Sequence, residues 1–493
     1  MYEQLLKTVT NLGSPQILLL GDFMLDVYVY GDALRISPEA PVPVLKVQST
    51  KYACGGAGSV ANDLLALGAQ VSCVGATGDD DNAGRLRRML AEAGADIEGL
   101  ITLCARPTTT KQRLIGLAQH RHPQQLIRID DECADRFSDA ITQQIEKLCQ
   151  DNIAQADIVC LQDYNKGLLT ESLCQKVIRM AAKAGKKVAV DPAFINDYSK
   201  YSGATLITPN RKEASAAAGL EIHNADDAAR AAKNLHKKLQ LQAVVITLDK
   251  EGAYLHTDGF SQLVPTIPKD VYDVTGAGDM VLAMLAVTLA GGCDYQTAVQ
   301  LANIAGGIEV GKFGSATVTI DEMVNEIISV HRGKTGKIRQ LDSLLTELDW
   351  HRRQKEKIVF TNGCFDVLHR GHIEFLKFCK AQGDVVVLGL NSDSSVKQIK
   401  GADRPVNNQH DRAAVLAALE TVDYIVIFEE LDPLNLIKQT RPDVLVKGKD
   451  WQDRGVVGRE FVESYGGKVV LAPLVEGKSS TATIEKMKSL KSG

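Results

Sequence analysis

The chain has 493 residues, which is too long for one ordinary hydrophobic core and predicts two or three domains. Its formal net charge of −5 at pH 7 excludes the strongly basic surface of a nucleic-acid-binding protein and gives no attraction to an anionic membrane. With 45% hydrophobic and 24% charged residues, and no apolar run of membrane-spanning length, the composition is that of a globular protein.

The cysteines and the first residues both indicate a cytoplasmic location. The ten cysteines contain no C-x-x-C pair, which fits reduced thiols and argues against a structural zinc site. The opening MYEQLLKTVTNLG lacks the basic start and apolar core of a signal peptide. We therefore expect a cytoplasmic protein with small-molecule partners, without nucleic-acid or membrane partners.

Short apolar runs recur along the chain, and several end in a polar or acidic residue. In the first two-thirds they are QILLLGD (16–22), DIVCLQDY (157–164), KVAVDP (187–192), TLITPN (205–210) and AVVITLDKEG (243–252). In the last third they are KIVFTNG (357–363), DVVVLGLNSD (384–393), YIVIFEE (424–430), DVLVKGKD (443–450) and KVVLAP (468–473). Such strands, alternating with helical stretches, predict parallel sheets with ligands beyond their carboxyl ends. The chain is thus expected to hold two α/β domains, at 1–332 and 357–493.

Three further segments differ from this pattern. Residues 330–342 are polar and basic without apolar periodicity, so 333–356 are expected to form a linker and a helix leading into the second domain. Residues 28–47 and 106–130 carry prolines and β-type alternation instead of helix signals. They predict either a small antiparallel flap over the first site or ordinary edge strands.

The motif DVTGAGD (273–279) suggests a phosphoryl-transfer site. Glycines at 276 and 278 free the backbone to turn N–H groups towards one point, and the apolar run after Asp279 reads as a buried helix. Backbone donors at a helix N-terminus bind anions, and a carboxylate there can take the proton of an attacking hydroxyl. The alternative is a glycine turn in which Asp279 only caps the helix.

Other polar positions support this site. Asn210 and Glu213 in TPNRKE are spaced to hold phosphate and magnesium-bound water. Gly55 and Gly56 open another predicted helix, where absent side chains let a sugar approach the backbone. Asp22 and Asp26 follow the first strand, where carboxylates can accept hydrogen bonds from sugar hydroxyls.

At this point the chain resembles the ribokinase-like (PfkB) carbohydrate kinases over about residues 1–330. The match rests on GGAG (55–58), VGATGDD (74–80), TPNRKE (208–213) and DVTGAGD, in the family's order. The resemblance implies a three-layer α/β fold, with Asp279 as general base, Gly55 and Gly56 beside the sugar, and Glu213 binding Mg²⁺ through water. The residues that it assigns to ATP are Asn210, Arg211, Lys212, Glu213, Thr275, Gly276, Ala277 and Gly278.

The second domain opens with a strand, a glycine turn and HRGH (369–372). His369 and His372 can both face a phosphate chain from a helix N-terminus, where imidazole N–H groups would stabilise charge on the α-phosphate and on departing pyrophosphate. The alternatives are a zinc site, for which no third ligand lies nearby in sequence, and a helix cap.

This segment resembles the cytidylyltransferase-like nucleotidyltransferases over about residues 357–493, which implies a Rossmann-like α/β domain. The match continues through GLNSDSSVKQIKG (389–401), Arg404-Pro405, VKGKDW (446–451) and EGKSST (476–481). The residues that the resemblance assigns to the nucleotide are Asn362, Gly363, Cys364, Phe365, Asp366, Asp393, Lys397, Lys400, Arg412, Lys447, Gly448, Ser479, Ser480 and Thr481.

The two halves together resemble the bifunctional heptose 7-phosphate kinases and heptose 1-phosphate adenylyltransferases of ADP-heptose and lipopolysaccharide core synthesis. The match is strengthened by RISPEAPVPV (35–44) and DYNKGLL (163–169), whereas DPAF (191–194) and Lys449 depart from the family pattern. The resemblance implies ATP as substrate in both sites, Mg²⁺, a homodimer formed through the flap, and a separate phosphatase acting between the two steps. Arg113 and Arg128 are candidate ligands of the sugar 7-phosphate.

Three alternatives stay open from the sequence. The same two chemistries can act on another sugar or polyol phosphate, with CTP in the second site. One half can have lost catalysis and serve as a dimerisation scaffold. A glycine pattern at 56–61 followed by Asp79 imitates a dinucleotide-binding fingerprint, so an NAD oxidoreductase is the third alternative.

Overall fold

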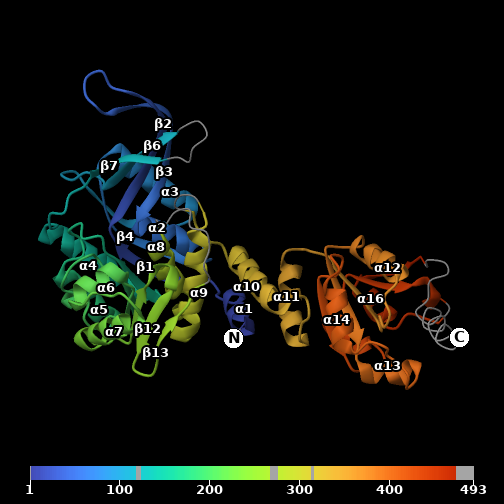
Figure 1. The fold of residues 1–493 in the computed structure, drawn as a ribbon. Coiled ribbons are helices and arrows are strands. Elements are labelled where there is room, and N and C mark those ends of the chain that lie inside the picture. Colours follow the sequence, from blue (N-terminus) through green and yellow to red (C-terminus); the bar gives the residue numbers. More distant parts are fainter. Residues whose placement is uncertain (1, 118–123, 267–275, 313–315, 453, 474–493) are drawn as a thin grey trace. The chain divides into compact units, whose positions relative to one another are not determined.

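The computed structural model describes residues 2–117, 124–266, 276–312, 316–452 and 454–473 (Figure 1). The chain forms two compact units, one of Lys7–Glu326 and one that joins Met1–Leu6 to Ile327–Gly493. Each unit has its own α/β sheet, so the predicted fold class is confirmed. No helix of the described residues is both long enough and apolar enough to span a bilayer.

The larger unit is built on one extended sheet. Among the described strands its order is β13-β12-β11-β10-β9-β8-β1-β4-β5, with parallel neighbours from β11 to β5 and an antiparallel edge at β12 and β13. The strands are β1 (Gln16–Gly21), β4 (Gln70–Gly78), β5 (Asp96–Leu103), β8 (Ile158–Gln162), β9 (Lys187–Asp191), β10 (Leu206–Ile207), β11 (Ala243–Thr247), β12 (Ala253–Thr257) and β13 (Ser261–Val264). Every apolar run predicted in this part of the chain is therefore a strand.

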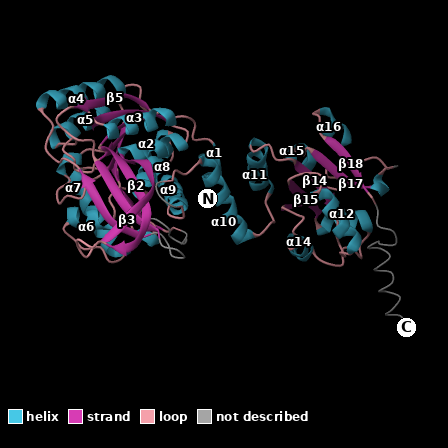
Figure 2. Ribbon diagram, turned by 90° about the horizontal axis from the view of Figure 1, so that it is seen from above, coloured by secondary structure: helices cyan, strands magenta, loops and turns pink. Residues whose placement is uncertain are grey.

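Figure 2 shows α6 and α7 on one side of the larger unit and α8 and α9 on the other. The buried apolar residues of α4 to α7 form one core with strand residues such as Leu18 and Leu20. Helix α8 packs against α2, α9 and the strands β8 and β9. The helices of this unit are α2 (Ala57–Ala66), α3 (Asp81–Ala93), α4 (Asp139–Ile153), α5 (Glu171–Lys183), α6 (Arg211–Ala218), α7 (Ala225–Leu239), α8 (Ala277–Ala290) and α9 (Tyr295–Glu309). Helices α1 (Tyr2–Thr10) and α10 (Ile320–Thr335) each have residues in both units.

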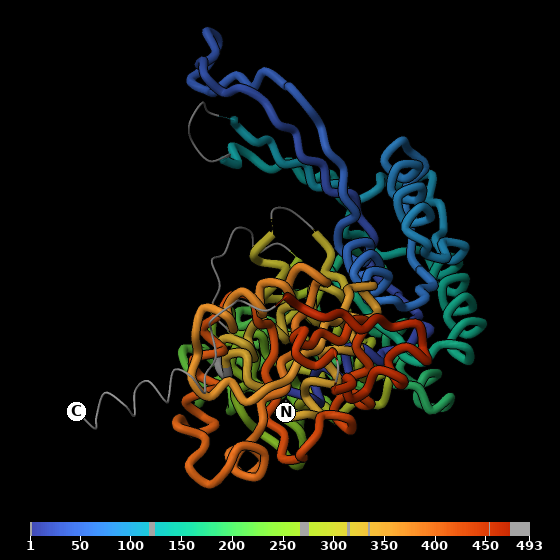
Figure 3. The backbone as a smooth tube through the Cα atoms, turned by 90° about the vertical axis from the view of Figure 1, so that its right-hand side faces the viewer, coloured from blue at the N-terminus to red at the C-terminus, as the bar shows by residue number. Residues whose placement is uncertain are grey.

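The predicted flap exists as a separate sheet, ordered β3-β2-β6-β7 within the described residues. It consists of β2 (Phe23–Ile36), β3 (Pro43–Gly56), β6 (Thr110–Leu117) and β7 (Gln124–Asp131). The β2–β3 hairpin stands out from the body of its unit (Figure 3). The flap is not antiparallel throughout, because β2 and β6 run parallel.

The smaller unit has a fully parallel sheet, which the structure orders β16-β15-β14-β17-β18 over its described part. Its strands are β14 (Ile358–Gly363), β15 (Val385–Asn391), β16 (Tyr424–Phe428), β17 (Val444–Gly448) and β18 (Lys468–Ala472). Its helices are α11 (Leu341–Arg353), α12 (Arg370–Lys380), α13 (Asp393–Lys400), α14 (Gln409–Ala417), α15 (Leu434–Thr440) and α16 (Arg459–Ser464).

The segment expected to be a linker is mostly helical. Helix α10 runs through residue 332 to Thr335, and α11 is the helix that was expected to lead into the second domain. Leu344 and Leu348 of α11 are fully buried in the same core as residues of β14 to β17. Glu347 forms a buried ion pair with Arg339 at 2.6 Å. The smaller unit therefore begins well before residue 357.

The first residues of the chain also belong to the smaller unit. The ring of Tyr2 stacks on His331 with centroids 3.6 Å apart, and the carboxylate of Glu3 accepts a hydrogen bond from the hydroxyl of Ser343. These contacts join the two ends of a long stretch of chain, which no local sequence pattern reveals.

We predict that a fragment of residues 337–493 is far more stable than one of residues 357–493. The shorter fragment loses the buried side chains of Leu344 and Leu348, and emptying one such leucine site typically costs about 2–5 kcal/mol. Thermal or urea unfolding of both fragments measures the difference. Equal stability would place α11 outside the folding unit.

Candidate active sites

The candidate base of the larger unit, Asp279, is buried in the first turn of α8. The preceding Gly276 has φ of 101°, and a side chain there would also collide with the Glu309 carboxylate, so glycine is required. The first-turn N–H groups of Ala277 and Gly278 have no partner within a helix, which is the geometry of an anion site. Thr275, also assigned to ATP, lies outside the described residues.

Two side chains from the end of β8 hold the Asp279 carboxylate. Its Oδ1 accepts hydrogen bonds from Gln162 Nε2 at 2.8 Å and from the Tyr164 hydroxyl at 3.2 Å. Gln162 Nε2 also donates to Asp191 Oδ2 at 2.8 Å. Burial and the nearby Asp191 carboxylate raise the pKa of Asp279 to about 8. A pKa near working pH suits a general base.

Asn210 and Glu213 form a capping box at the start of α6. Asn210 Oδ1 accepts the N–H groups of Lys212 and Glu213 at 2.9 and 3.0 Å, and Glu213 Oε2 accepts that of Asn210 at 2.8 Å. Burial, followed by repulsion from Asp191, raises the pKa of Glu213. The motif is thus a helix start that also carries a partly buried carboxylate towards Asp191.

The other two residues of this motif point to different surroundings. Arg211 donates to Asp249 at 3.0 Å and to Glu251 at 2.6 Å, so its guanidinium is held by the neighbouring loop. Lys212 is exposed at the surface. The surroundings of Arg211 and Lys212 therefore give no further support to their assignment to ATP.

The predicted sugar-side residues meet where β1 ends and the flap begins. Asp22 Oδ2 accepts the N–H groups of Tyr164 and Lys166 at 2.9 and 3.2 Å, and burial raises the pKa of Asp22 to about 6. Gly56 has φ of 56°, and a Cβ there would lie 2.5 Å from the carbonyl oxygen of Asp22. A Cβ at Gly55 would lie 2.9 Å from Asp26 Oδ2, so close packing requires both glycines.

In the smaller unit the two candidate histidines lie at the start of α12, directly beyond β14. Their rings stack with centroids 3.9 Å apart and an interplanar angle of 18°. Burial, then the neighbouring His369 and Lys400, lower the pKa of His372 to about 4. His372 is therefore uncharged near neutral pH and can donate from one ring nitrogen.

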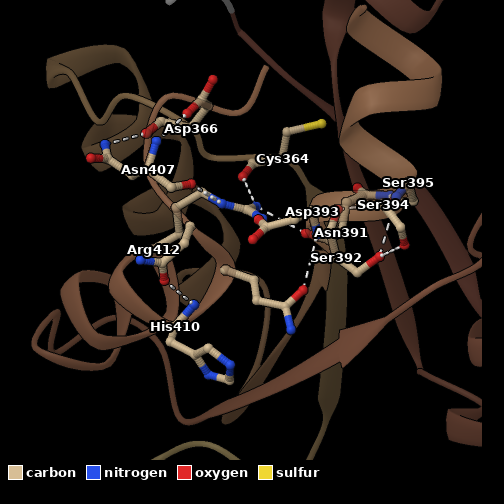
Figure 4. A network of polar contacts seen from close by, with 12 residues as sticks. Cys364, Asp366, Asn391, Ser392, Asp393, Ser394, Ser395, Asn407, His410 and Arg412 are labelled. Atoms are coloured by element: carbon tan, nitrogen blue, oxygen red, sulfur yellow. Dashed lines mark hydrogen bonds and ion pairs between the residues drawn. The ribbon is translucent and has the colours of Figure 1, made fainter. Parts of the chain in front are cut away.

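A buried arginine organises the loops around this site (Figure 4). Arg412 donates to the carbonyl oxygens of Cys364 at 2.6 Å, Asn391 at 2.9 Å and Asn407 at 3.0 Å, and pairs with Asp393 at 2.6 Å. Its donors thus join the loop after β14, the end of β15 and the start of α13. The arginine is held by the protein, so its contacts favour a positioning role over phosphate binding.

Asp366 ties down a second loop. Its carboxylate accepts bonds from Arg404 Nε at 2.5 Å and from the N–H groups of Val406 and Asn407 at 2.6 and 3.1 Å. These bonds, with Arg404 the largest favourable contribution, hold the pKa of Asp366 below its usual range even though burial opposes them. Phe365, beside it, is buried with φ of 42° and packs 5.2 Å from His372 between ring centroids.

The remaining nucleotide candidates are spread around the same edge of the sheet. Asn362 and Gly363 end β14, Gly448 ends β17, and Lys397 and Lys400 are exposed on α13. Lys447 donates to the Asn362 carbonyl oxygen at 3.2 Å, and burial lowers its pKa to about 8. Ser479, Ser480 and Thr481 lie outside the described residues.

Comparison with known proteins matches both halves. The model of the pfkB family carbohydrate kinases covers residues 14–322, and the cytidylyltransferase-like model covers 360–475. The bifunctional protein HldE of Geobacter metallireducens is 44% identical over 471 residues, covering 95% of each chain. That of Nitratiruptor sp. is 45% identical over 477 residues, covering 96% of this chain and 99% of its own. The chain belongs to the HldE family.

Solved structures show the fold of the kinase half. A ribokinase from Arabidopsis thaliana, complexed with ribose and ATP, covers 64% of this chain and 99% of its own, with a TM-score of 0.51 and 19% identity. Phosphofructokinase-2 from Escherichia coli, in its tetrameric inhibited form, covers 64% of this chain and all of its own, with a TM-score of 0.55 and 19% identity. This HldE-family chain is therefore an enzyme with a ribokinase-like kinase domain and a nucleotidyltransferase domain.

The two departures from the family pattern find places in the structure. In DPAF, Asp191 is bound by Gln162 and Thr208, and the N–H of Ala193 donates to the Tyr201 hydroxyl at 3.1 Å. Lys449 starts a short 3-10 helix and does not have positive φ, so its backbone does not need glycine. Sequence alone did not assign Asp191, Gln162 or Tyr164 to the site, although Gln162 and Asp191 end β8 and β9 and Tyr164 lies two residues after β8.

We predict that the kinase activity rises with pH while the transferase activity does not follow it. The proton acceptor is the carboxylate form of Asp279, and a pKa of about 8 leaves most of the free enzyme protonated at pH 7. The value of kcat/KM should therefore increase from about pH 6 to about pH 9. His372 stays uncharged over this range. Initial rates of both reactions on one preparation provide the measurement, and a flat kinase profile would contradict this assignment.

Proposed function

We propose that the larger unit phosphorylates D-glycero-D-manno-heptose 7-phosphate at C1 with ATP. The smaller unit then transfers AMP from ATP to heptose 1-phosphate, giving ADP-heptose and pyrophosphate. Membership of the HldE family over nearly the whole chain supports this pairing of activities. The single observation that carries the kinase half is Asp279, buried in the first turn of α8 and beyond the carboxyl ends of β8 and β9.

In the kinase reaction Asp279 takes the proton of the C1 hydroxyl as that oxygen attacks the γ-phosphorus of ATP. The bond from the γ-phosphorus to the β–γ bridging oxygen breaks, and ADP leaves with that oxygen. The N–H groups of Ala277 and Gly278 bind the transferring group, whose negative charge the start of α8 favours. Asp22 and Asp26 accept hydrogen bonds from the sugar.

The residues around Glu213 fit a divalent cation. Glu213 and Asp191 are neighbouring carboxylates with pKa values raised chiefly by burial, and a cation would favour their charged forms. Glu213 would hold Mg²⁺ through water, and the ion would supply positive charge to the phosphates of ATP.

Besides Arg113 and Arg128, the flap offers Lys111 as a cationic side chain for the 7-phosphate. Arg113 pairs with Asp26 at 2.8 Å, and Arg128 pairs with Asp130 at 2.8 Å. Lys111 lies in register with both of these aspartates, yet forms an ion pair with neither among the described contacts. Burial lowers its pKa. A phosphate at Lys111 would compensate this cation, so we include Lys111 with Arg113 and Arg128 as its ligands.

In the adenylyl transfer a phosphate oxygen of the sugar 1-phosphate attacks the α-phosphorus of ATP, and pyrophosphate leaves. His369 and His372 donate N–H groups to the charge that develops on both phosphates. Arg412 and Asp366 hold the loops that surround the pair, and Lys400 and Lys447 add positive charge.

The two reactions do not join directly. The kinase product is a 1,7-bisphosphate, whereas the transferase takes the 1-phosphate, so we propose that a separate phosphatase acts between them. Purified chain given heptose 7-phosphate and ATP should accumulate the bisphosphate, and form ADP-heptose only after a phosphatase is added. Substantial ADP-heptose from the chain alone, detected by mass spectrometry, would reject the scheme.

The flap also supports a homodimer. Its sheet exposes large apolar side chains, among them Leu34 (70% exposed), Ile36 (64%) and Ile127 (54%), which is unusual for a surface in contact with water only. Ile36→Asp with Ile127→Asp should convert a dimer to a monomer in sedimentation.

A cytoplasmic location completes the proposal, because both reactions consume ATP and all ten cysteines are unpaired.

A further inference from the structure

Tyr164 contacts several parts of the kinase site that are far apart in the sequence. Its hydroxyl donates to Asp279 Oδ1 at 3.2 Å, and its backbone N–H donates to Asp22 Oδ2 at 2.9 Å. The ammonium of Lys111, on the flap, lies 4.6 Å from its ring centroid. The same residue therefore touches the candidate base, a sugar-side carboxylate and the flap.

The phenol is held as a hydrogen-bond donor. Burial and the Asp279 carboxylate raise the pKa of Tyr164 well above its ordinary range, so it stays protonated wherever the enzyme works. A protonated phenol facing a carboxylate donates to it.

Gln162 donates a second hydrogen bond to the same oxygen. Its Nε2 group lies 2.8 Å from both Asp279 Oδ1 and Asp191 Oδ2. Since both neighbours are carboxylate oxygens, the amide must present its two N–H groups to them. Two donors, on β8 and just after it, thus meet Asp279 at a single oxygen.

We infer that Tyr164 is a positioning residue of the phosphoryl transfer, which holds the Asp279 carboxylate by Oδ1 so that the carboxylate is oriented to accept the proton of the attacking hydroxyl. The inference rests on the proposed kinase activity and deepens it. Ser59 also hydrogen bonds to this carboxylate, so Tyr164 shares the task with Ser59 and Gln162.

Replacing the phenol by a phenyl ring should change catalysis in a specific way. Tyr164→Phe keeps the ring beneath Lys111 and removes one hydrogen bond to a charged group, which predicts a fall in kcat of about 10-fold or more. The KM values for ATP and sugar phosphate should change little, because no bond to substrate is removed. The hydrogen bond from Tyr164 lowers the pKa of Asp279, so its loss should shift the kinase pH profile towards higher pH.

Tyr254→Phe is the matched control. It removes a hydroxyl that is hydrogen bonded to Ser261 at 3.0 Å on β12 and β13, in the same unit but at the antiparallel edge of the sheet. It should leave kcat and the pH profile as in the wild type. The adenylyl transfer of each variant reports whether the rest of the chain is intact.

The decisive experiment measures the kinase pH profile of wild type, Tyr164→Phe, Tyr164→Leu and Tyr254→Phe as ADP release. The inference is supported if both Tyr164 variants, and not Tyr254→Phe, show a lower kcat and a pH profile shifted to higher pH. Tyr164→Leu is included because a bound water could replace the missing hydroxyl in Tyr164→Phe and keep part of the hydrogen bonding to Asp279. Profiles of Tyr164→Phe and Tyr254→Phe that coincide with the wild type overturn it. If wild type does not turn over heptose 7-phosphate, the proposed substrate fails, and the same comparison is made on the sugar phosphate that it does use.

Discussion

Asp279→Asn is expected to lower the kinase rate by about 10²–10⁴, the usual contribution of a general base, and to leave adenylyl transfer unchanged. The amide keeps the size of the side chain and can still contact Gln162 and Tyr164, but it cannot take a proton from a hydroxyl. ADP release and pyrophosphate release, measured on the same preparation, report the two activities separately.

The matched control is Asp227→Asn. Asp227 lies on α7, where its carboxylate accepts a hydrogen bond from the N–H of His223 and pairs with Arg230. It therefore belongs to the same unit as Asp279 but not to the kinase site. This variant should keep kinase activity near that of the wild type. If Asp279→Asn lost both activities in parallel, the separation of the two sites or the role of Asp279 would be wrong.

The parts of the kinase site that sequence predicted share a physical reason. A parallel strand buried on both faces is a continuous apolar run, so its end is visible as the first polar residue, and Asp22, directly after β1, is such a residue. Gly56 and Gly276 have positive φ and no room for a side chain, so a glycine in the sequence directly indicates the backbone conformation at these two positions. These features are local, and a single segment of chain contains the whole signal.

The parts that sequence missed depend on which segments become neighbours. Gln162 and Tyr164 reach Asp279 across more than a hundred residues, and nothing in DYNKGLL states which carboxylate they will meet. The arginines illustrate the converse. Nothing in the sequence shows that register on the flap pairs Arg113 with Asp26, or that the loop after β11 brings a carboxylate to Arg211.

The boundary between the units was predicted imperfectly for the same reason. Polar composition at 330–342 suggested a linker, but α10 extends to Thr335, and Arg339 there is compensated by Glu347. In the sequence, an arginine that is buried and paired with a carboxylate cannot be told from an exposed arginine. The place of Tyr2 beside His331 has no local signal at all.

Loss of either histidine at the start of α12 should be the largest effect on the second activity. We expect His369→Ala and His372→Ala each to lower adenylyl transfer by about 10²–10³, the usual contribution of one preorganised donor to developing charge, while the kinase rate stays unchanged. The lowered pKa of His372 means that it acts as a neutral donor, so the loss should be similar at pH 6 and pH 8. His223→Ala, at an exposed position in the other unit, is the control.

A metal site is the alternative that this experiment also decides. The described residues contain no group of three or more His, Cys, Asp or Glu side chains placed to hold a metal ion. The stacked rings at 3.9 Å instead suit two donors that face one phosphate chain from the N-terminus of α12. Release of one equivalent of zinc from either variant would replace this role by a structural one. Retained stability, measured by thermal unfolding, together with a selective loss of pyrophosphate release, would instead assign both imidazoles to the transferred nucleotide.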